Sequence, residues 1–331
     1  MTDLPKFVQD LGHGVFAVDT GFHREVFDAA YLVVQDGRAA FIDTGTNHAV
    51  PRLLAALAAA GLAPEALDWL IVTHVHLDHA GGAGRLMQAL PSARLVVHPR
   101  GARHMIDPTA LFEGARAVYG AAEMARSYGT LVPVAAERVL ATHDGMTLHL
   151  GGRPLLFIDT PGHARHHHAI WDERSRGFFT GDTFGLSYRE FDVAGRAWLL
   201  PTSTPVQFEP EPLKASVRRM LGFDPAWLYL THFGRVGSVP RLGGLMLEQT
   251  DAMVALALPC SGGGAERHAA LRQGLAALYL ARVRAHGCGL PDETVLGLLE
   301  MDIELNAQGL AVWLDRPHPT PQPSSTGSAH G

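Results

Sequence analysis

Three histidines and one aspartate, namely His74, His76, Asp78 and His79, lie within six residues of the sequence. Imidazole and carboxylate ligands together suit zinc, iron or manganese, and without a nearby cysteine they do not indicate a closed structural zinc site. Because His74 and His76 are two residues apart, an extended backbone points both side chains the same way, so that they can share one ion. Asp78 and His79 follow where the chain turns and can face a different ion. The spacing therefore predicts a metal site.

The elements around this cluster would hold it rigidly. The short apolar run at 69–72 is rich in aromatic and β-branched residues and is typical of a buried strand. Gly81 and Gly82 permit a tight turn, and the apolar residues at 86–90 predict that a helix follows. Ligands at the carboxyl end of a strand are usual for the site of a layered α/β protein.

Three later motifs also follow predicted strands. They are Thr-Pro-Gly-His at 160–163, Thr-Gly-Asp-Thr at 180–183 and Tyr-Leu-Thr-His at 229–232. In the first of them, proline and glycine fix a tight turn that aims His163 back toward the strand ends. Each motif therefore places a histidine or an aspartate just after a predicted strand.

With Thr-His-Val-His-Leu-Asp-His-Ala-Gly-Gly at 73–82, these motifs resemble in order the signature of the metallo-β-lactamase superfamily. The resemblance covers about residues 12–240. It implies an α/β fold, the four-layer αβ/βα sandwich, and a cofactor of two divalent metal ions, zinc first and iron or manganese as alternatives. The ligands that it implies are His74, His76 and His163 for one ion, Asp78, His79 and His232 for the other, and Asp182 as the bridge.

Two further residues are expected to orient these ligands. In the family, the residue that matches Asp43 supports the histidine loop, although Asp43 could also be a simple turn residue. His167, four residues after His163, is expected to form hydrogen bonds or to pack rather than to bind metal. The roles of His98, His104 and His166 stay open.

Asp78, Asp182 and Tyr188 are the candidate catalytic residues. A carboxylate between two cations can hold them about 3.5–4 Å apart, a separation at which one hydroxide can bind both, so Asp182 is the main candidate. The Tyr188 hydroxyl could steady a substrate carbonyl or leaving group, or Tyr188 could simply be a wall of the pocket. The segment 98–144 could roof the site or be a structural insertion.

The resemblance implies a hydrolase that uses metal-bound hydroxide to cleave an ester-like bond. Flavodiiron proteins carry Glu where this chain has His76, and class B β-lactamases carry Cys where it has Asp182. The ligand set is similar to that of glyoxalase II thioesterases and acyl-homoserine-lactone lactonases, although the interval from His79 to His163 is long for either. Lactone, thioester, other carboxylic ester and phosphoester substrates stay open. The alternatives are a mononuclear iron oxidoreductase of the persulfide dioxygenase type and a non-catalytic metal-binding protein.

Composition limits the other partners. The 331 residues are 47% hydrophobic and carry a net charge of −6, so a large core is expected and a basic nucleic-acid surface is not. No apolar run reaches the roughly 20 residues that span a bilayer, and the first residues do not read as a secretory signal. We therefore expect a cytoplasmic protein with a small-molecule substrate. Two cysteines, Cys260 and Cys288, fall in a region expected to be helical and make no disulfide framework.

The chain divides by its patterns into three parts. Residues 1–239 are expected to form the catalytic domain, with strands at 15–18, 31–34 and 39–42 and an Asp-Gly hairpin turn at 36–37. A helix is predicted at 48–60 with Asn47 as its N-cap. Residues 240–315 are Ala/Leu-rich with helical spacing at 245–258, 267–286 and 293–314, and could form a homodimer. Residues 316–331 are expected to be a flexible tail.

Overall fold

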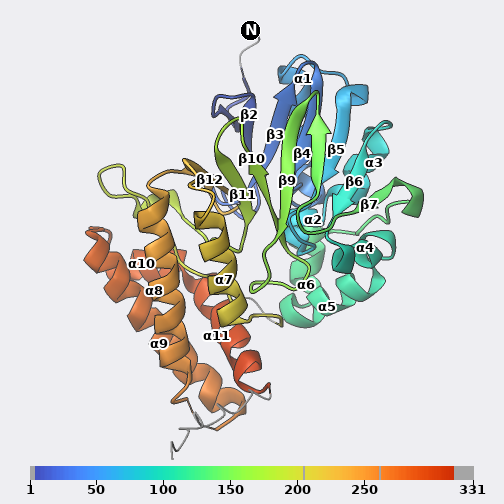
Figure 1. The fold of residues 1–331 in the computed structure, drawn as a ribbon. Helices are drawn as coiled ribbons and strands as arrows, with labels where there is room; N and C mark the ends of the chain where they lie inside the picture. The colour runs from blue at the N-terminus through green and yellow to red at the C-terminus, as the bar shows by residue number, and fades with distance from the viewer. Residues whose placement is uncertain (1–3, 204–205, 261, 317–331) are drawn as a thin grey trace, which may run out of the picture.

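The computed structural model of the chain describes residues 4–203, 206–260 and 262–316 (Figure 1). The predicted tail at 316–331 therefore lies outside the described residues, apart from Arg316. Within the described part, two β-sheets pack face to face and helices cover their outer faces. No helix in the described ranges is both long and apolar enough to cross a membrane.

The first sheet carries the central histidine motif. In the described residues its seven strands follow chain order: β1 Val8–Asp10, β2 Val15–Asp19, β3 Ala29–Gln35, β4 Arg38–Ile42, β5 Leu67–Ile71, β6 Arg94–Val97 and β7 Val139–Ala141. The strands β1 to β4 are antiparallel neighbours, and β4 to β7 are parallel. The predicted hairpin is confirmed, because β3 and β4 pair across Asp36 and Gly37, which both have positive φ.

The second sheet carries the later motifs. In the described residues its six strands are β8 Thr147–Leu150, β9 Arg153–Asp159, β10 His168–Asp172, β11 Gly177–Gly181, β12 Trp227–Leu230 and β13 Gly234–Val236. The spatial order is β13-β12-β11-β10-β9-β8, and the pairs are antiparallel except for β11 with β12.

Helices connect and cover the sheets. They are α1 Val50–Ala59, α2 Leu77–Ala80, α3 Ala83–Ala89, α4 Pro99–Ile106, α5 Thr109–Tyr119, α6 Ala121–Glu123, α7 Pro210–Leu221, α8 Val239–Ala257, α9 Gly264–His286, α10 Asp292–Leu298 and α11 Glu300–Leu314. A short π-helical turn, Met124–Tyr128, follows α6. Figure 1 shows α7 to α11 gathered at one end of the molecule, below the sheets in this view.

Alternation along the strands separates the layers. In β4, Phe41 packs with Leu53 of α1 on the outer face, whereas Ile42 lies in the core between the sheets. In β11, Phe179 lies in that same core, and Phe178 packs in the cluster that contains the apolar face of α7. The arrangement helix, sheet, sheet, helix is the expected four-layer sandwich.

The C-terminal helices extend the outer layer beside α7. Leu271 and Leu275 of α9 and Leu310 of α11 belong to the same buried cluster as Phe178 of the second sheet. The core is thus continuous across residue 239, and the division of the chain at that point stays a prediction.

Several local expectations were wrong. Thr46 rather than Asn47 caps the turn before α1, because its Oγ1 accepts a hydrogen bond from the amide of His48 at 3.3 Å, while the Asn47 side chain donates to the Thr130 carbonyl. The helix expected at 293–314 is divided into α10 and α11. The region around Cys260 and Cys288 is helical as expected, and both free thiols lie just beyond the ends of α8 and α9.

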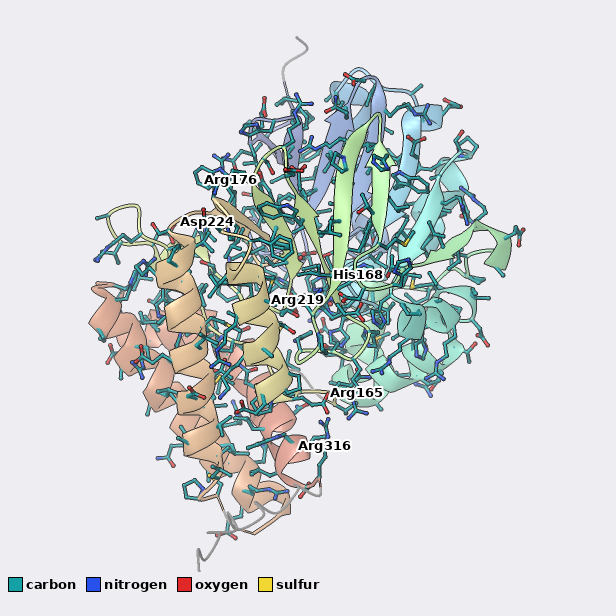
Figure 2. The ribbon with its side chains drawn as sticks, viewed as in Figure 1. Arg165, His168, Arg176, Arg219, Asp224 and Arg316 are labelled. Atoms are coloured by element: carbon teal, nitrogen blue, oxygen red, sulfur yellow. The ribbon has the colours of Figure 1, made fainter. Side chains whose placement is uncertain are left out.

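Ion pairs link the helices to the sheets. Arg219 of α7 contacts Asp144 at 2.7 Å, in the loop before β8, and lies between α7 and the sheets in Figure 2. The exposed pair Arg176 and Asp224, 2.6 Å apart, joins the loop before β11 to the loop before β12. Exposed pairs of this kind contribute little to stability individually, so the sandwich depends mainly on its buried clusters.

Candidate metal centre

The seven predicted ligands converge from four loops at one edge of the two sheets. His74 and His76 lie between β5 and α2, and Asp78 and His79 lie in the single turn of α2. The other three come from the second sheet. His163 lies in the β9–β10 loop, Asp182 directly follows β11, and His232 lies between β12 and β13. Parallel β4, β5 and β6 bring their carboxyl ends to this edge, which is where an α/β sheet usually places its site.

One group of ligand atoms consists of three imidazoles. His76 Nδ1 lies 2.8 Å from His74 Nε2 and 3.0 Å from His163 Nε2. The three ring nitrogens lie within 4.8 Å of one another, close enough to hold one ion.

The second group joins Asp78, His79 and His232. The Oδ2 atom of Asp78 lies 3.3 Å from His232 Nε2 and 3.7 Å from His79 Nε2. These ligand atoms also lie within 4.8 Å of one another. The structure thus brings the six terminal ligands of the expected set together as two triads.

Asp182 lies between the two groups. Its Oδ2 is 3.5 Å from His163 Nε2, in the first group, and its Oδ1 is 3.3 Å from His79 Nε2, in the second. One carboxylate oxygen therefore faces each triad, as a bridging ligand would require.

In the part of the chain that the structure describes, two of the candidate ligand atoms lack hydrogen-bond partners, which a metal ion would replace. His79 Nε2 and Asp182 Oδ1 are both buried, and neither has a hydrogen-bond partner in the described residues. An unpartnered buried polar atom costs roughly 1–3 kcal/mol, and a cation would satisfy both atoms at once. This pair of orphaned atoms is the observation that favours metal.

Electrostatics favour neutral imidazoles in the first triad. Burial lowers the pKa of His76 to about 3, and burial also lowers the pKa of His74 and of His163. A neutral imidazole keeps the nitrogen lone pair that a metal requires. Burial acts the same way on His232, but the carboxylates of Asp182 and Asp78 outweigh it and raise the pKa of His232 to about 9.

Asp43 contacts the candidate ligand segments from behind, and its supporting role stays a prediction. Its carboxylate accepts hydrogen bonds from the Thr73 amide at 2.8 Å and from Thr231 Oγ1 at 3.0 Å, and its Oδ2 lies 2.8 Å from His79 Nδ1. Thr73 and Thr231 each directly precede a ligand. Asp43 therefore fixes three ligand segments, which come from both sheets.

His167 holds the backbone of Asp182 rather than joining a triad. Its Nε2 accepts a hydrogen bond from the Asp182 amide at 3.3 Å, and its Nδ1 lies 2.7 Å from Thr160 Oγ1. A Cβ at Gly181 would lie 2.5 Å from His167 Nε2, and Gly181 has a φ of +48°, so only glycine fits there. These are packing and hydrogen-bonding contacts, and the orienting role of His167 stays a prediction.

Sequence reasoning missed His168, which lies fully buried near the centre of Figure 2. Its Nε2 lies 2.9 Å from the Val72 carbonyl, its Nδ1 lies 2.9 Å from Thr142 Oγ1, and its amide donates to the Thr73 carbonyl at 3.0 Å. His168 thus holds the end of β5, immediately before the first ligand. The sequence could have indicated this role, because alternation along β10 points the side chain of residue 168 into the protein.

The three histidines whose roles were open lie around the site rather than in the ligand triads. His98 caps α4, since its Nδ1 accepts from the Arg100 amide at 3.2 Å. His166 Nδ1 accepts from the Val75 amide at 3.4 Å. His104 lies on α4 beside a cavity described below. The segment 98–144 contains α4 to α6, and its Tyr119 and Tyr128 line the small cavity described below.

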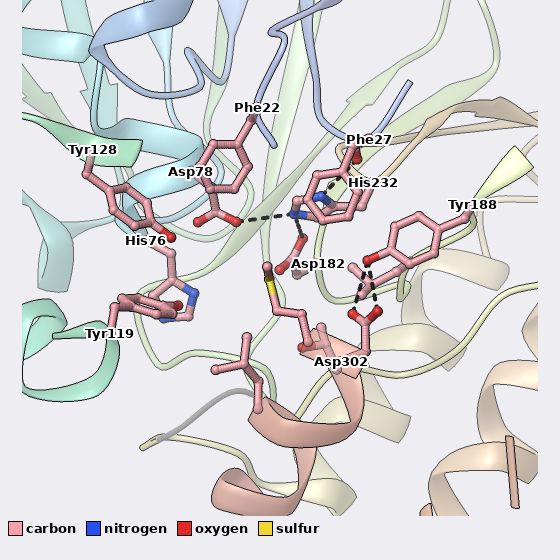
Figure 3. Close-up of a pocket in the computed structure, with 14 residues that line it drawn as sticks. Phe22, Phe27, His76, Asp78, Tyr119, Tyr128, Asp182, Tyr188, His232 and Asp302 are labelled. Atoms are coloured by element: carbon pink, nitrogen blue, oxygen red, sulfur yellow. Dashed lines mark hydrogen bonds and ion pairs between the residues drawn. The ribbon is translucent and has the colours of Figure 1, made fainter. Parts of the chain in front are cut away.

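Tyr188 is buried, and its hydroxyl already forms a hydrogen bond with another side chain. It donates to Asp302 of α11, with both carboxylate oxygens 3.0 Å away (Figure 3). Burial raises the pKa of Asp302 to about 7. Sequence reasoning missed Asp302, because it lies 114 residues after Tyr188 and only the packing of α11 brings the two together.

A cavity of about 50 Å³ lies over the metal-ligand groups. Figure 3 shows Asp78, Asp182 and His232 at its back, with Tyr119 and Tyr128 on one side and Tyr188 with Asp302 on the other. The cavity is further lined by Phe22, Phe27, Leu186, Thr202, Met301 and Leu305. A small aromatic chamber over a polar metal centre can enclose a reacting group and exclude most water.

The four-layer αβ/βα sandwich gathers a triad of three histidines, a triad of two histidines and one aspartate, and an aspartate between them at one edge, and this combination defines a class of protein. The family model for the metallo-β-lactamase superfamily matches residues 24–232. This stretch is more than half of the chain and contains all seven predicted ligands. The chain therefore belongs to the metallo-β-lactamase superfamily.

Two relatives show how far the sequence similarity reaches. The metallo-beta-lactamase fold-containing protein ST1585 of Sulfurisphaera tokodaii is 28% identical over 174 residues, which cover 51% of this chain and 62% of the relative. A hydroxyacylglutathione hydrolase of Acidiphilium cryptum is 31% identical over 204 residues, which cover 61% of this chain and 62% of the relative. The matched stretch spans less than two thirds of either relative.

Solved structures show that the fold is shared more widely. The crystal structure of ST1585 from Sulfolobus tokodaii has a TM-score of 0.64 at 22% identity, covering 90% of this chain and 98% of that one. A metallo-beta-lactamase family protein from Thermus thermophilus, TTHA1429, has a TM-score of 0.64 at 20% identity, covering 92% and 94%. Residues 1–239 alone cannot account for this coverage, so the shared fold extends into the C-terminal helices.

Proposed function

We propose that this protein is a metal-dependent hydrolase that cleaves an ester-like bond at a centre of two divalent cations. The carboxylate of Asp182, with one oxygen facing each triad, is the observation that carries the proposal. Zinc is the first candidate metal and iron or manganese the next, because neutral imidazoles and carboxylates suit all three.

The ligand roles follow the two triads. His74, His76 and His163 would hold one cation, Asp78, His79 and His232 the other, and Asp182 both. When bound, such cations lower the pKa of a coordinated water from 15.7 to roughly 7 and polarise a carbonyl or phosphoryl oxygen.

The chain's own residues prepare the site for this chemistry. Asp43 and His167 fix the ligands, so that little reorganisation is needed during the reaction. The aromatic walls of the chamber limit water to a few molecules. Asp78 and Asp182 have carboxylate oxygens at the reacting centre that can accept a proton from an attacking water. The Tyr188 hydroxyl already donates to Asp302, so we assign Tyr188 to the pocket wall.

Several substrates remain candidates for this site. The similarity to a hydroxyacylglutathione hydrolase supports a thioester or related acyl substrate. Lactones and other carboxylic esters use the same acyl chemistry, and phosphoesters are the fourth option. We also propose that the helices α8 to α11 form a homodimer, which light scattering of the purified protein would test.

Metal content and turnover measured on one sample test the proposed function. We expect about two divalent ions per chain and hydrolysis of at least one member of a panel of lactones, thioesters, carboxylic esters and phosphoesters, with turnover lost on chelation. The variants H76A and D182N should lose both metal and turnover. The matched variant H149A, at an exposed histidine in β8, should keep both. One iron per chain together with oxygen consumption on glutathione persulfide would overturn the hydrolase proposal.

A further inference from the structure

A second cavity, of about 260 Å³, opens beside the metal centre along one face of α5. Its wall on this helix is formed by residues at helical spacing, which therefore share one face: Ala110, Leu111, Gly114, Ala115 and Val118. Leu77 of α2 lies opposite. We call this cavity the α5 groove.

The α5 groove continues from the chamber over the metal centre. His76 and Tyr119 line both cavities, and Figure 3 shows the Tyr119 ring beside the His76 imidazole. A molecule that reacts beside His76 can therefore extend past Tyr119 into the α5 groove. The chamber alone, at about 50 Å³, has room for little more than the reacting group.

The lining of the α5 groove is apolar and uncharged. Among the described residues that line it there is no Lys, Arg, Asp or Glu side chain. Its polar groups are Gln207 and the non-ligand histidines His104 and His166, and burial lowers the pKa of His166 to about 3, so that this ring is neutral. An apolar cavity of about 150 Å³ holds a benzene ring, and the α5 groove is larger than that. It can therefore hold an aliphatic chain of about six or more carbons.

A different cavity on the opposite side of the chamber is charged. It shares Phe27 and Met301 with the chamber and is lined by His23, Arg24, Arg272, Glu300 and Glu304. Both of its arginines form ion pairs, Arg24 with Glu190 and Arg272 with Glu304. The chamber is thus flanked by one apolar and one charged cavity, so a substrate with one apolar and one polar end has a defined orientation.

We propose that the α5 groove binds the linear aliphatic acyl chain of a carboxylic ester or thioester. The inference rests on the proposed hydrolase function and narrows its substrate class. In the reaction, water adds to the acyl carbon, the C–O or C–S bond breaks and the leaving oxygen or sulfur takes a proton. The products are an aliphatic acid on the α5 side and a polar alcohol or thiol on the charged side.

A chain-length series of p-nitrophenyl esters, from acetate through butyrate and hexanoate to octanoate, tests this assignment. Burial of one methylene contributes about 0.8 kcal/mol, which corresponds to about fourfold in kcat/KM when burial is complete. We expect an increase of two- to fourfold per added methylene up to the octanoate.

The variant G114F should remove this preference. A Cβ at Gly114 meets no atom within 4 Å, so a side chain can enter the groove without a clash with the backbone. We expect kcat/KM for the octanoate to fall at least tenfold, while that for the acetate stays within twofold. The control G244F also places a side chain in open space, on the exposed face of α8, and should leave the whole series unchanged.

Binding of a neutral, unreactive amide separates the groove from the hydrolase proposal. N-methyloctanamide should bind the protein as purified, measured by calorimetry, at least tenfold more tightly than N-methylacetamide, and G114F should abolish the difference. If no ester turns over but this difference is found, the groove assignment stands and the proposed function fails. If esters turn over with no dependence on chain length, or G114F retains the octanoate preference, the groove assignment is wrong.

Discussion

At the scale of single residues, the candidate ligands are positioned by hydrogen bonds from neighbouring side chains that do not themselves belong to the triads. Asp43 contacts His79 directly and reaches two further ligands through Thr73 and Thr231. His167 holds the Asp182 amide, and His168 holds the end of β5. Partners of this kind set the ring orientation of metal ligands, and their loss typically weakens metal affinity or activity by 10–100-fold.

Replacement of Asp43 by alanine tests this dependence. D43A removes the acceptor of the Thr73 amide and of His79 Nδ1, both buried, so we expect metal affinity to fall about 10–100-fold. Competition with a chromophoric chelator measures that affinity. D43N keeps one oxygen acceptor and should give an intermediate value. Wild-type affinity in D43A would show that the ligands are positioned without Asp43.

At the scale of elements, α11 is the part of the C-terminal region that reaches the site. It places Met301, Asp302 and Leu305 on the chamber wall. The Asn306 side chain of the same helix accepts a hydrogen bond from the Ser203 amide at 2.6 Å. The backbone at Ser203 therefore docks on α11, so the shape of the chamber depends on where this helix lies.

The close approach of α11 to this loop predicts a strong effect of a single methyl group. A Cβ at Gly309 would lie 1.4 Å from the Ser203 carbonyl oxygen, so G309A must displace either the helix or the loop. We expect a loss of stability of about 2–4 kcal/mol, measured by urea denaturation. G244A on α8 meets no atom within 4 Å and should be neutral or stabilising by up to about 1 kcal/mol. Equal stability of the two variants would contradict the tight docking of α11.

Asp302 makes the packing of α11 sensitive to pH. Its ordinary pKa of 3.8 is raised to about 7 by burial. Between these values the folded chain keeps a proton that the unfolded chain releases, so the free energy of unfolding falls as the pH rises from about 4 to about 7. A shift of this size corresponds to roughly 4 kcal/mol.

The variant D302N should lack this contribution. Relative to wild type, D302N should become more stable by roughly 2–4 kcal/mol between pH 4.5 and pH 8. Urea denaturation of chelator-treated protein is the suitable measurement, because bound cations would lower the pKa of Asp302. A constant difference between the two proteins across this range would mean that Asp302 is ionised throughout.

The strands, α11 and α5 show which features of the candidate site can be predicted from the sequence and which cannot. The seven candidate ligands, together with Asp43 and His167, lie in short motifs next to strands, and a strand end positions a neighbouring side chain reproducibly. Asp302 could not be found this way, because nothing near it in the sequence specifies that α11 folds back onto Tyr188. The α5 groove was missed for a related reason. Its residues look like an ordinary apolar helix face, and only the placement of α5 beside His76 gives that face a possible ligand.

At the scale of the whole molecule, the candidate centre joins the two halves of the sandwich. His74, His76, Asp78 and His79 follow the first sheet, whereas His163, Asp182 and His232 follow the second. Protein contacts also cross between the halves at this edge, for example the hydrogen bond from the Thr231 hydroxyl to Asp43. Cations held by both sets of ligands would therefore act as cross-links between the sheets.

Removal of metal should consequently destabilise the entire fold rather than the site alone. A cation at about 1,000 times its Kd stabilises the folded state by about 4 kcal/mol, and in a domain of about 150–250 residues each kcal/mol shifts Tm by about 2–4 °C. We expect chelation to lower Tm by about 10 °C or more in calorimetry, and added zinc to restore it. H76A should show a smaller response to chelator, and H149A the full response. If chelation left the Tm of the wild type unchanged, the seven residues would not be holding the sheets together through metal.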